Sequence, residues 1–158
     1  MSQAMQTTLV IFKPDCILRG LVGEILDRFE KRGLKIVGIK KIKLSNEILE
    51  EHYSHIKDKP FFPGVVEAMQ RTPVIVLALR GVDAANVARK MAGATNAREA
   101  EPGTIRGDLA VSIQNNLVHI SDSPESAEAE VKRFFTPEEL IDSTEEEFSV
   151  IYSKDELE

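Results

Sequence analysis

Asn116-Leu117-Val118-His119-Ile120-Ser121-Asp122 is the stretch of sequence from which the fold and the chemistry of the chain are best interpreted. Its three apolar side chains predict a short, half-buried strand. Ser123 and Pro124, which follow, predict the start of a helix, with the serine as the N-cap and the proline in the first helical position. His119 is therefore expected at the end of a strand and beside a helix N-terminus.

A histidine in this position can be reactive. The unperturbed pKa of imidazole is about 6.5, so much of the side chain is uncharged near neutral pH and can attack an electrophile or exchange a proton. Taken alone, however, a histidine at a strand end is more often a structural or surface residue. Both interpretations of His119 stay open until other residues are considered.

The composition indicates an ordinary soluble globular protein. The 158 residues are 42% hydrophobic and 29% charged, which suits one domain over 1–158, with a core at about 6–152 and a frayed tail at 153–158. The net charge of -6 argues against a nucleic-acid-binding protein, and the single cysteine excludes an internal disulfide and a cysteine-based zinc site. We expect no membrane span and no leader segment, and hence a cytoplasmic location.

The apolar periodicity predicts alternating strands and helices. Strands are expected at 7–12, 34–44, 73–79 and 117–120, and helices at 20–32, 45–53, 61–69, 83–92 and 124–134. Residues 93–108 have no steady period and are expected to form a long irregular excursion. One strongly apolar strand among amphipathic ones favours a ferredoxin-like α/β (α+β) sandwich, in which helices cover one face of a four-stranded antiparallel sheet.

Any nucleotide bound by this chain must be held by side chains, because neither a G-x-x-x-x-G-K-[ST] loop nor a G-x-G-x-x-G turn is present. Lys13 follows the first strand, Arg89 lies on a helix, and Thr95 and Arg106 lie in the irregular segment. Each of these would commonly be a surface charge or a loop cap if it stood alone. Their combination with His119 indicates a phosphate site.

Further motifs carry a family resemblance. In order they are Ile11-Phe-Lys-Pro-Asp15, Arg19-Gly-Leu-Val-Gly23, His52-Tyr53, Lys59-Pro-Phe-Phe62, Gly93, Thr95-Asn96, Pro102-Gly-Thr-Ile-Arg-Gly-Asp108, Asn116 through Asp122, Glu125-Ser-Ala-Glu128 and Pro137-Glu-Glu-Leu140. From about Thr7 to Tyr152 the chain resembles the nucleoside diphosphate kinase family. The resemblance implies a ferredoxin-like fold, Mg²⁺ held mainly by nucleotide phosphates, and a homo-oligomer, with a hexamer favoured over a tetramer. The implied partners are nucleoside triphosphates and diphosphates, between which the terminal phosphoryl group is transferred.

The resemblance also implies a role for individual residues. His119 would be the nucleophile that becomes a phosphohistidine in a ping-pong reaction. The implied catalytic supports are Lys13, Tyr53, Glu130 and Ser121. The implied nucleotide-binding residues are Lys13, Phe61, Val65, Arg89, Thr95, Arg106, Ile113 and Asn116, with the ring of Phe61 stacked on the base. Phe61 could instead be a core aromatic, and either Glu130 or the backbone carbonyl near Ile120 could orient the imidazole.

Three positions depart from the family pattern. The family commonly has a small residue at Ile120, a glycine at Cys16 and a proline at Ala97. His52 and His55 are expected to be surface residues on a helix, without a metal role. Two rival functions stay open: a non-catalytic nucleotide-binding regulatory module of the same fold, and a scaffold for protein interactions.

Overall fold

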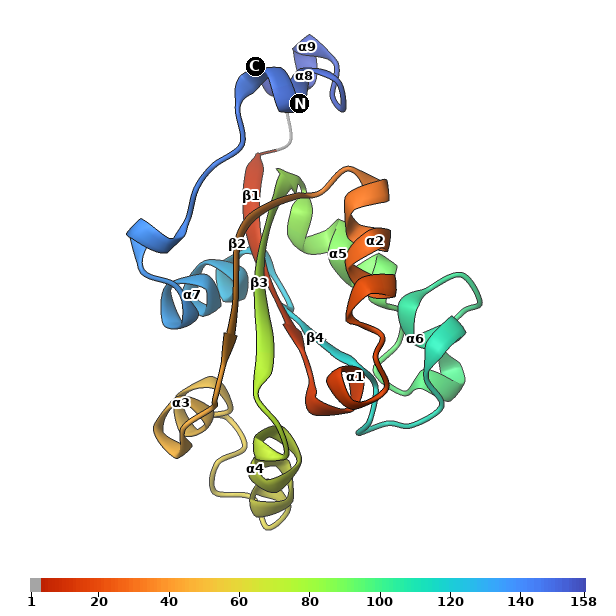
Figure 1. Ribbon diagram of the computed structural model, residues 1–158, viewed down its shortest axis with the longest axis vertical. Coiled ribbons are helices and arrows are strands. Elements are labelled where there is room, and N and C mark those ends of the chain that lie inside the picture. Colours follow the sequence, from red (N-terminus) through yellow and green to blue (C-terminus); the bar gives the residue numbers. More distant parts are fainter. Residues whose placement is uncertain (1–3) are drawn as a thin grey trace.

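Four antiparallel strands form one sheet in the order β2-β3-β1-β4 (Figure 1). The computed structural model describes residues 4–158. The strands are β1 (Met5–Phe12), β2 (Lys35–Ile42), β3 (Val74–Val82) and β4 (Val118–Ile120). The predicted ferredoxin-like sandwich with a four-stranded antiparallel sheet is thus confirmed.

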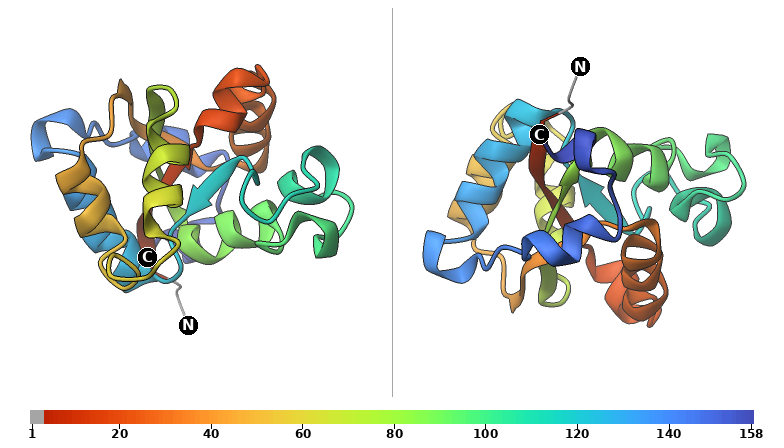
Figure 2. Two further views of the ribbon diagram at one scale, coloured as in Figure 1. Left: turned by 90° about the horizontal axis from the view of Figure 1, so that it is seen from below. Right: turned by 90° about the horizontal axis from the view of Figure 1, so that it is seen from above.

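Helices cover both faces of this sheet, so the prediction of one covered face was wrong. Helices α2 (Val22–Arg32) and α5 (Ala84–Ala92) lie on one face, and α3 (Asn46–His52), α4 (Phe62–Gln70) and α7 (Pro124–Phe134) pack on the other. Figure 2 shows α2 and α5 on the opposite side of the sheet from α3 and α7. The reason lies in β1, whose alternate residues Leu9 and Ile11 join one apolar cluster while Val10 and Phe12 join the other. A strand that is apolar on both sides needs a cover on each.

Short helices occupy segments between and after the longer elements. These are α1 (Pro14–Leu18), η1 (Ala97–Glu99), α6 (Ile105–Leu109), η2 (Pro137–Glu139), α8 (Glu145–Ser149) and α9 (Lys154–Leu157). The irregular excursion at 93–108 therefore contains η1 and the start of α6. The segment expected to fray forms α9, where Ser153 and Glu156 make a capping box. Across residues 4–158, no helix has the length and apolar character needed to cross a membrane.

Strand β4 is one residue shorter than predicted because Leu117 belongs to a tight turn. The N–H of Val118 donates to the carbonyl of Asn116 at 2.9 Å, and Leu117 between them has φ +76°, as in a γ-turn. This conformation is strained for a branched residue. It is held by α1, because the Leu117 N–H donates to Asp15 Oδ2 and its carbonyl accepts from the Lys13 N–H, both at 2.9 Å.

The C-terminal residues pack beyond the start of β1, where Figure 1 shows α8 and α9. Phe148 is buried, and the Tyr152 hydroxyl accepts a hydrogen bond from the N–H of Val82 at 3.0 Å. The tail thereby covers the end of the sheet at which β1 begins and β3 ends.

Candidate active site

A cavity of about 520 Å³ collects the predicted nucleotide-binding residues from six separate segments of the chain. It is lined, among others, by Lys13, Tyr53, Phe61, Val65, Arg89, Thr95, Arg106, Ile113, Asn116 and His119. All eight predicted nucleotide-binding residues therefore border one space. Two predicted catalytic supports, Glu130 and Ser121, are buried behind His119 rather than on the cavity wall.

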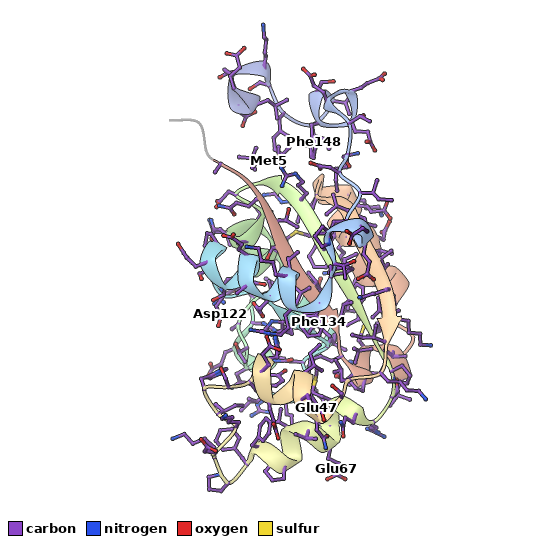
Figure 3. All side chains as sticks on the ribbon, turned by 90° about the vertical axis from the view of Figure 1, so that its left-hand side faces the viewer. Met5, Glu47, Glu67, Asp122, Phe134 and Phe148 are labelled. Carbon is purple, nitrogen blue, oxygen red and sulfur yellow. The ribbon has the colours of Figure 1, made fainter. Side chains whose placement is uncertain are left out.

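His119 is positioned by the short strand β4, where it pairs with Ile11 of β1. Its ring faces α3 and α7, and Figure 3 shows α7 running from near Asp122 to Phe134 beside α3. The Nε2 atom forms a hydrogen bond with Oε1 of Glu130 on α7. A carboxylate oxygen accepts, so Nε2 carries the proton and Nδ1 carries the lone pair of the neutral ring. Of the two candidate partners for the imidazole, the structure selects Glu130.

Glu130 is a charged acceptor despite its burial. Burial on its own would raise its pKa, but the hydrogen bond and the charge of His119, aided by Ser121 and His52, outweigh this effect and leave the pKa below its ordinary value. Ser121 is fully buried, and its hydroxyl accepts from the N–H of Leu9 at 3.3 Å. Ser121 thus ties the end of β4 to β1 while supporting the negative charge of Glu130.

His52 lies inside this site, so the prediction that it is a surface residue was wrong. It ends α3 and is 8% exposed. Its ring meets that of His119 edge to face, with the ring centres 4.5 Å apart. Burial, followed by the nearby His119, lowers its pKa to about 3. His55 is exposed as predicted, but it lies in the turn after α3 rather than on the helix.

The three ionisable groups His52, His119 and Glu130 offer ligand atoms within 4.8 Å of one another. Two imidazoles and a carboxylate would suit zinc better than Mg²⁺, which prefers oxygen ligands. However, Nη1 of Arg133 donates to Nδ1 of His52 at 2.9 Å, so Nε2 of His52 carries its proton and offers no lone pair. This group is therefore an arrangement of hydrogen-bonding side chains and not a cage for a cation.

Mg²⁺ bound through nucleotide phosphates would fit the cavity. Among the described residues that line it, Asp122 supplies the one carboxylate, and this carboxylate is paired with Nη1 of Arg89. A cation here would take most of its oxygen ligands from phosphates and water, as Mg²⁺ commonly does, with Asp122 as the nearby protein oxygen.

Arg106 forms a fixed positive wall of the cavity. Its guanidinium donates to the backbone carbonyls of Val118 at 2.7 Å, Gly93 at 2.9 Å and Asn116 at 3.3 Å. Burial, and then the neighbouring charge of Arg89, lower the pKa of Arg106 to about 10, which leaves it protonated at neutral pH. The bonded carbonyls hold the side chain in place without neutralising it.

Lys13 and Asn116 form a second polar unit. Lys13 Nζ donates to Asn116 Oδ1 at 2.9 Å, while the Asn116 amide donates to the carbonyl of Thr95 at 2.9 Å and that of Ile113 at 3.0 Å. Burial lowers the pKa of Lys13, and the charge of Arg106 acts in the same direction. The amide of Asn116 therefore fixes the ammonium group against the loop that carries Thr95.

The opposite wall is apolar and open. Phe61 is 58% exposed and Ile113 is 53% exposed, while Val65 is half-buried on α4. A large aromatic ring left this exposed on a cavity wall is not a core residue, so the core role for Phe61 is wrong.

Sequence comparison assigns the chain to a protein family. The sequence model of the nucleoside diphosphate kinase family matches residues 6–140. The chain belongs to this family. A nucleoside diphosphate kinase of Parabacteroides distasonis is 53% identical over 153 residues, and the match covers 97% of this chain and 100% of that protein. That of Pyrococcus abyssi is 55% identical over 140 residues, with coverage of 87% and 88%.

Solved structures agree. A halophilic nucleoside diphosphate kinase from Halobacterium salinarum in complex with CDP has a TM-score of 0.90 and 40% identity, and the match covers 94% of this chain and 99% of that one. A nucleoside diphosphate kinase family protein from Babesia bovis has a TM-score of 0.89 and 38% identity, with coverage of 93% and 99%.

The three residues expected to depart from the family pattern are all buried. Ile120 alternates to the other face of β4 and packs in the cluster of α2 and α5, although it also borders the cavity. Cys16 is fully buried on α1, and burial raises the pKa of its thiol to about 12. Ala97 is buried in η1.

Three residues of the site were missed by the sequence interpretation. His52, Arg133 and Asp15 all act through contacts with distant parts of the chain. A partial signal was present for Arg133, which follows Glu130 by three residues and so shares its face of α7. No local pattern indicates that His52 is buried, because its cover comes from α7.

Proposed function

We propose that this enzyme transfers the terminal phosphoryl group of a nucleoside triphosphate to a nucleoside diphosphate through a phosphohistidine on Nδ1 of His119. The kinase activity follows from membership of the family. Nδ1 is assigned as the attacking atom because Nε2 of His119 is hydrogen-bonded to Glu130, which leaves Nδ1 as the nitrogen with a free lone pair.

In the first half-reaction the lone pair of Nδ1 forms a bond to the γ-phosphorus while the bond from phosphorus to the β-phosphate oxygen breaks. The electron pair of that bond leaves with the nucleoside diphosphate. The imidazole becomes a cation, and its Nε2–H continues to donate to the Glu130 carboxylate, which stabilises the new charge. A second diphosphate then reverses these events in the same cavity, which predicts ping-pong kinetics.

The cavity walls divide the remaining work. Lys13, Arg89 and Arg106 supply positive charge for phosphate oxygens, with Thr95 beside them. Mg²⁺ bound to the phosphates would neutralise further negative charge. Lys13 and Asn116, which border the same cavity, would hydrogen-bond the sugar, and Tyr53 also borders this cavity.

Recognition of the base would rest on stacking. The exposed ring of Phe61, with Val65 and Ile113 as apolar neighbours, can contact the face of any base. Because stacking does not read the edge of a base, we expect broad nucleotide specificity.

Radiolabelling tests the nucleophile. Incubation with a γ-labelled nucleoside triphosphate should give an acid-labile, base-stable label on the protein, and His119→Ala should lose both the label and the exchange between nucleotides. Full exchange activity in His119→Ala would refute the assignment. Diphosphate binding without turnover in the unmodified chain would instead select the non-catalytic regulatory module.

We further propose that residues 1–158 form a single kinase domain and assemble into a cytoplasmic homo-oligomer, with a hexamer favoured over a tetramer. Ile39 of β2, Val111 and Ile141 are exposed apolar side chains that a subunit contact would cover. Light scattering coupled to gel filtration measures the subunit number, limited proteolysis tests the domain, and cell fractionation tests the location.

A further inference from the structure

His52 is a buried titratable residue to which the mechanism above gives no task. Its ring packs edge to face against three aromatic neighbours, with ring centres 4.5 Å from His119, 4.8 Å from Tyr53 and 5.4 Å from Phe134. Its side chain is 2% exposed. A nonpolar residue could fill such a space, so the presence of two ring nitrogens requires an explanation.

One nitrogen has a clear partner. Arg133 on α7 donates from Nη1 to Nδ1 of His52 at 2.9 Å, and its Nε lies 3.3 Å from a carboxylate oxygen of Glu51 on α3. A guanidinium can only donate, so Nδ1 must be an acceptor. The proton of the neutral ring therefore resides on Nε2.

The other nitrogen faces the catalytic pair. Nε2 of His52 is buried and has no hydrogen-bond partner among the described residues, and it lies 3.7 Å from Oε1 of Glu130. That same oxygen accepts the hydrogen bond from Nε2 of His119. Besides the Ser121 hydroxyl, the Nε2–H of His52 is thus a second nitrogen donor near the carboxylate, at a separation that a small movement of either side chain would close.

We infer that His52 is a positioning residue, which uses a proton fixed on Nε2 by Arg133 to hold the Glu130 carboxylate, and through it the ring of His119, in the orientation for phosphoryl transfer. This inference rests on the proposed function of His119. The chain of contacts runs from Arg133 to His52, Glu130 and His119, and only the last of these residues touches the phosphoryl group.

The second donor would matter most when charge changes. After Nδ1 of His119 takes the phosphoryl group, the imidazolium could pass its Nε2 proton to Glu130. A donor from His52 stabilises the carboxylate and disfavours that proton transfer, so the phosphorylated ring stays cationic and remains a good leaving group for the second half-reaction. The charged groups around His52 that bear on this balance are Glu51, Glu130, Arg133, His119 and the more distant His55.

Two substitutions separate the functions of the two nitrogens. In His52→Gln the amide nitrogen would lie near the position of Nε2 and could still donate to Glu130. In His52→Asn the amide oxygen would lie near the position of Nδ1, so this variant keeps the acceptor for Arg133 but loses the donor to Glu130. Phe29→Leu, in the cluster on the other face of the sheet, is a matched control for a general loss of stability.

Rapid-quench measurement of His119 phosphorylation at saturating triphosphate, beside thermal melting and diphosphate affinity, gives the test. We expect the rate to fall about tenfold in His52→Asn and less than about threefold in His52→Gln, with diphosphate affinity changed less than twofold in both. Phe29→Leu should melt earlier without a slower rate. Rates that follow melting temperature alone, or equal rates in the two His52 variants, would overturn the inference.

Nitrogen NMR of the unmodified enzyme gives a second readout that does not depend on variants. The shifts should place the His52 and His119 protons on Nε2, and a proton on Nδ1 of His52 would overturn the inference. The proposed function fails separately, because its test is the label on the unmodified enzyme and the loss of label and exchange in His119→Ala.

Discussion

His52 and His119 have adjacent rings but different access to water. His119 borders the cavity with a side chain 21% exposed, whereas the side chain of His52 is 2% exposed. The difference arises from the strand and the helix that carry them, because β4 ends at the cavity and α3 ends beneath α7. One histidine can therefore react with a ligand, while the other can act only on its protein neighbours.

Burial of a neutral His52 should make stability depend on pH. Its pKa is about 3 in the folded protein and about 6.5 in the unfolded chain, so the unfolded state binds more protons between these values. The stabilisation is complete above pH 6.5 and is lost as pH falls towards 3. Between pH 7 and pH 5 we expect a loss of about 2 kcal/mol from this residue.

Denaturant unfolding at pH 7 and pH 5, at one chain concentration, measures this loss. His52→Gln removes the titrating group. The fall in the free energy of unfolding from pH 7 to pH 5 should therefore be smaller in this variant than in the unmodified protein, and the difference should be about 2 kcal/mol. An identical pH dependence in the two proteins would show that His52 titrates normally when folded.

At this scale, residue types predicted the side chains that line the cavity better than the side chains behind them. Lys13, Arg89, Arg106 and His119 could be chosen because phosphate chemistry requires cations and a nucleophile. His52 could not, because its burial depends on α7, which lies more than 70 residues further along the chain. Side chains that contact a ligand are constrained by its chemistry, whereas those behind them are constrained by packing.

Among the elements, α6 contains a glycine that lies close to the backbone of the loop before it. Its second residue is Arg106, and the next is Gly107, where an added Cβ would lie 1.9 Å from the carbonyl oxygen of Glu101. No side chain fits there unless the backbone moves. The glycine thus lets the loop fold tightly enough to direct the preceding arginine into the cavity.

We expect Gly107→Ala to displace Arg106 and to weaken triphosphate binding at least tenfold, with a loss of about 1–3 kcal/mol in stability from the overpacked backbone. Calorimetric titration and denaturant unfolding would measure both effects. Gly64→Ala on α4 is the matched control, because its added Cβ meets nothing within 4 Å. The idea fails if both alanine variants bind nucleotide as tightly as the unmodified protein.

Elements with local signals were predicted well. Helix α2 ends at Gly33 in the left-handed conformation, and α7 begins at Ser123 and Pro124, as their sequences indicate. The γ-turn at Leu117 was not predicted, because it depends on a hydrogen bond to Asp15 that spans 102 residues. A local pattern cannot report a conformation that a distant partner imposes.

Across the whole molecule, the match to the family model ends at residue 140, but the fold does not. The tail returns to the end of the sheet, where the Tyr152 hydroxyl accepts a hydrogen bond from Val82 and Ile151 fills the space that a side chain at Gly33 would need. The presence of helices on both faces of the sheet was likewise not predicted. Both β1 and β3 have apolar side chains on each face, and only the two strands taken together show that neither face of the sheet is exposed to water. The antiparallel sheet itself followed from the order of strands and helices and from the resemblance.

Tyr152→Phe removes the hydroxyl that accepts from the Val82 N–H and leaves this donor without its partner. We expect the free energy of unfolding to fall by about 1 kcal/mol, with no change in the rate of His119 phosphorylation, since the contact lies at the end of the sheet away from β4. A change in the rate without a change in stability would mean that the tail communicates with the cavity.

The pairing of β4 with β1 through only three residues has a consequence for how the sequence can change. Successive residues of a strand face opposite sides, so deleting Val118 would move His119 into the place of Val118 and Ile120 into the place of His119. The nucleophile would then enter the apolar layer under α5, and isoleucine would face Glu130. Amino acids at position 120 can vary within the limits of core packing, but the number of residues before His119 cannot, so this segment should tolerate substitutions and reject insertions and deletions.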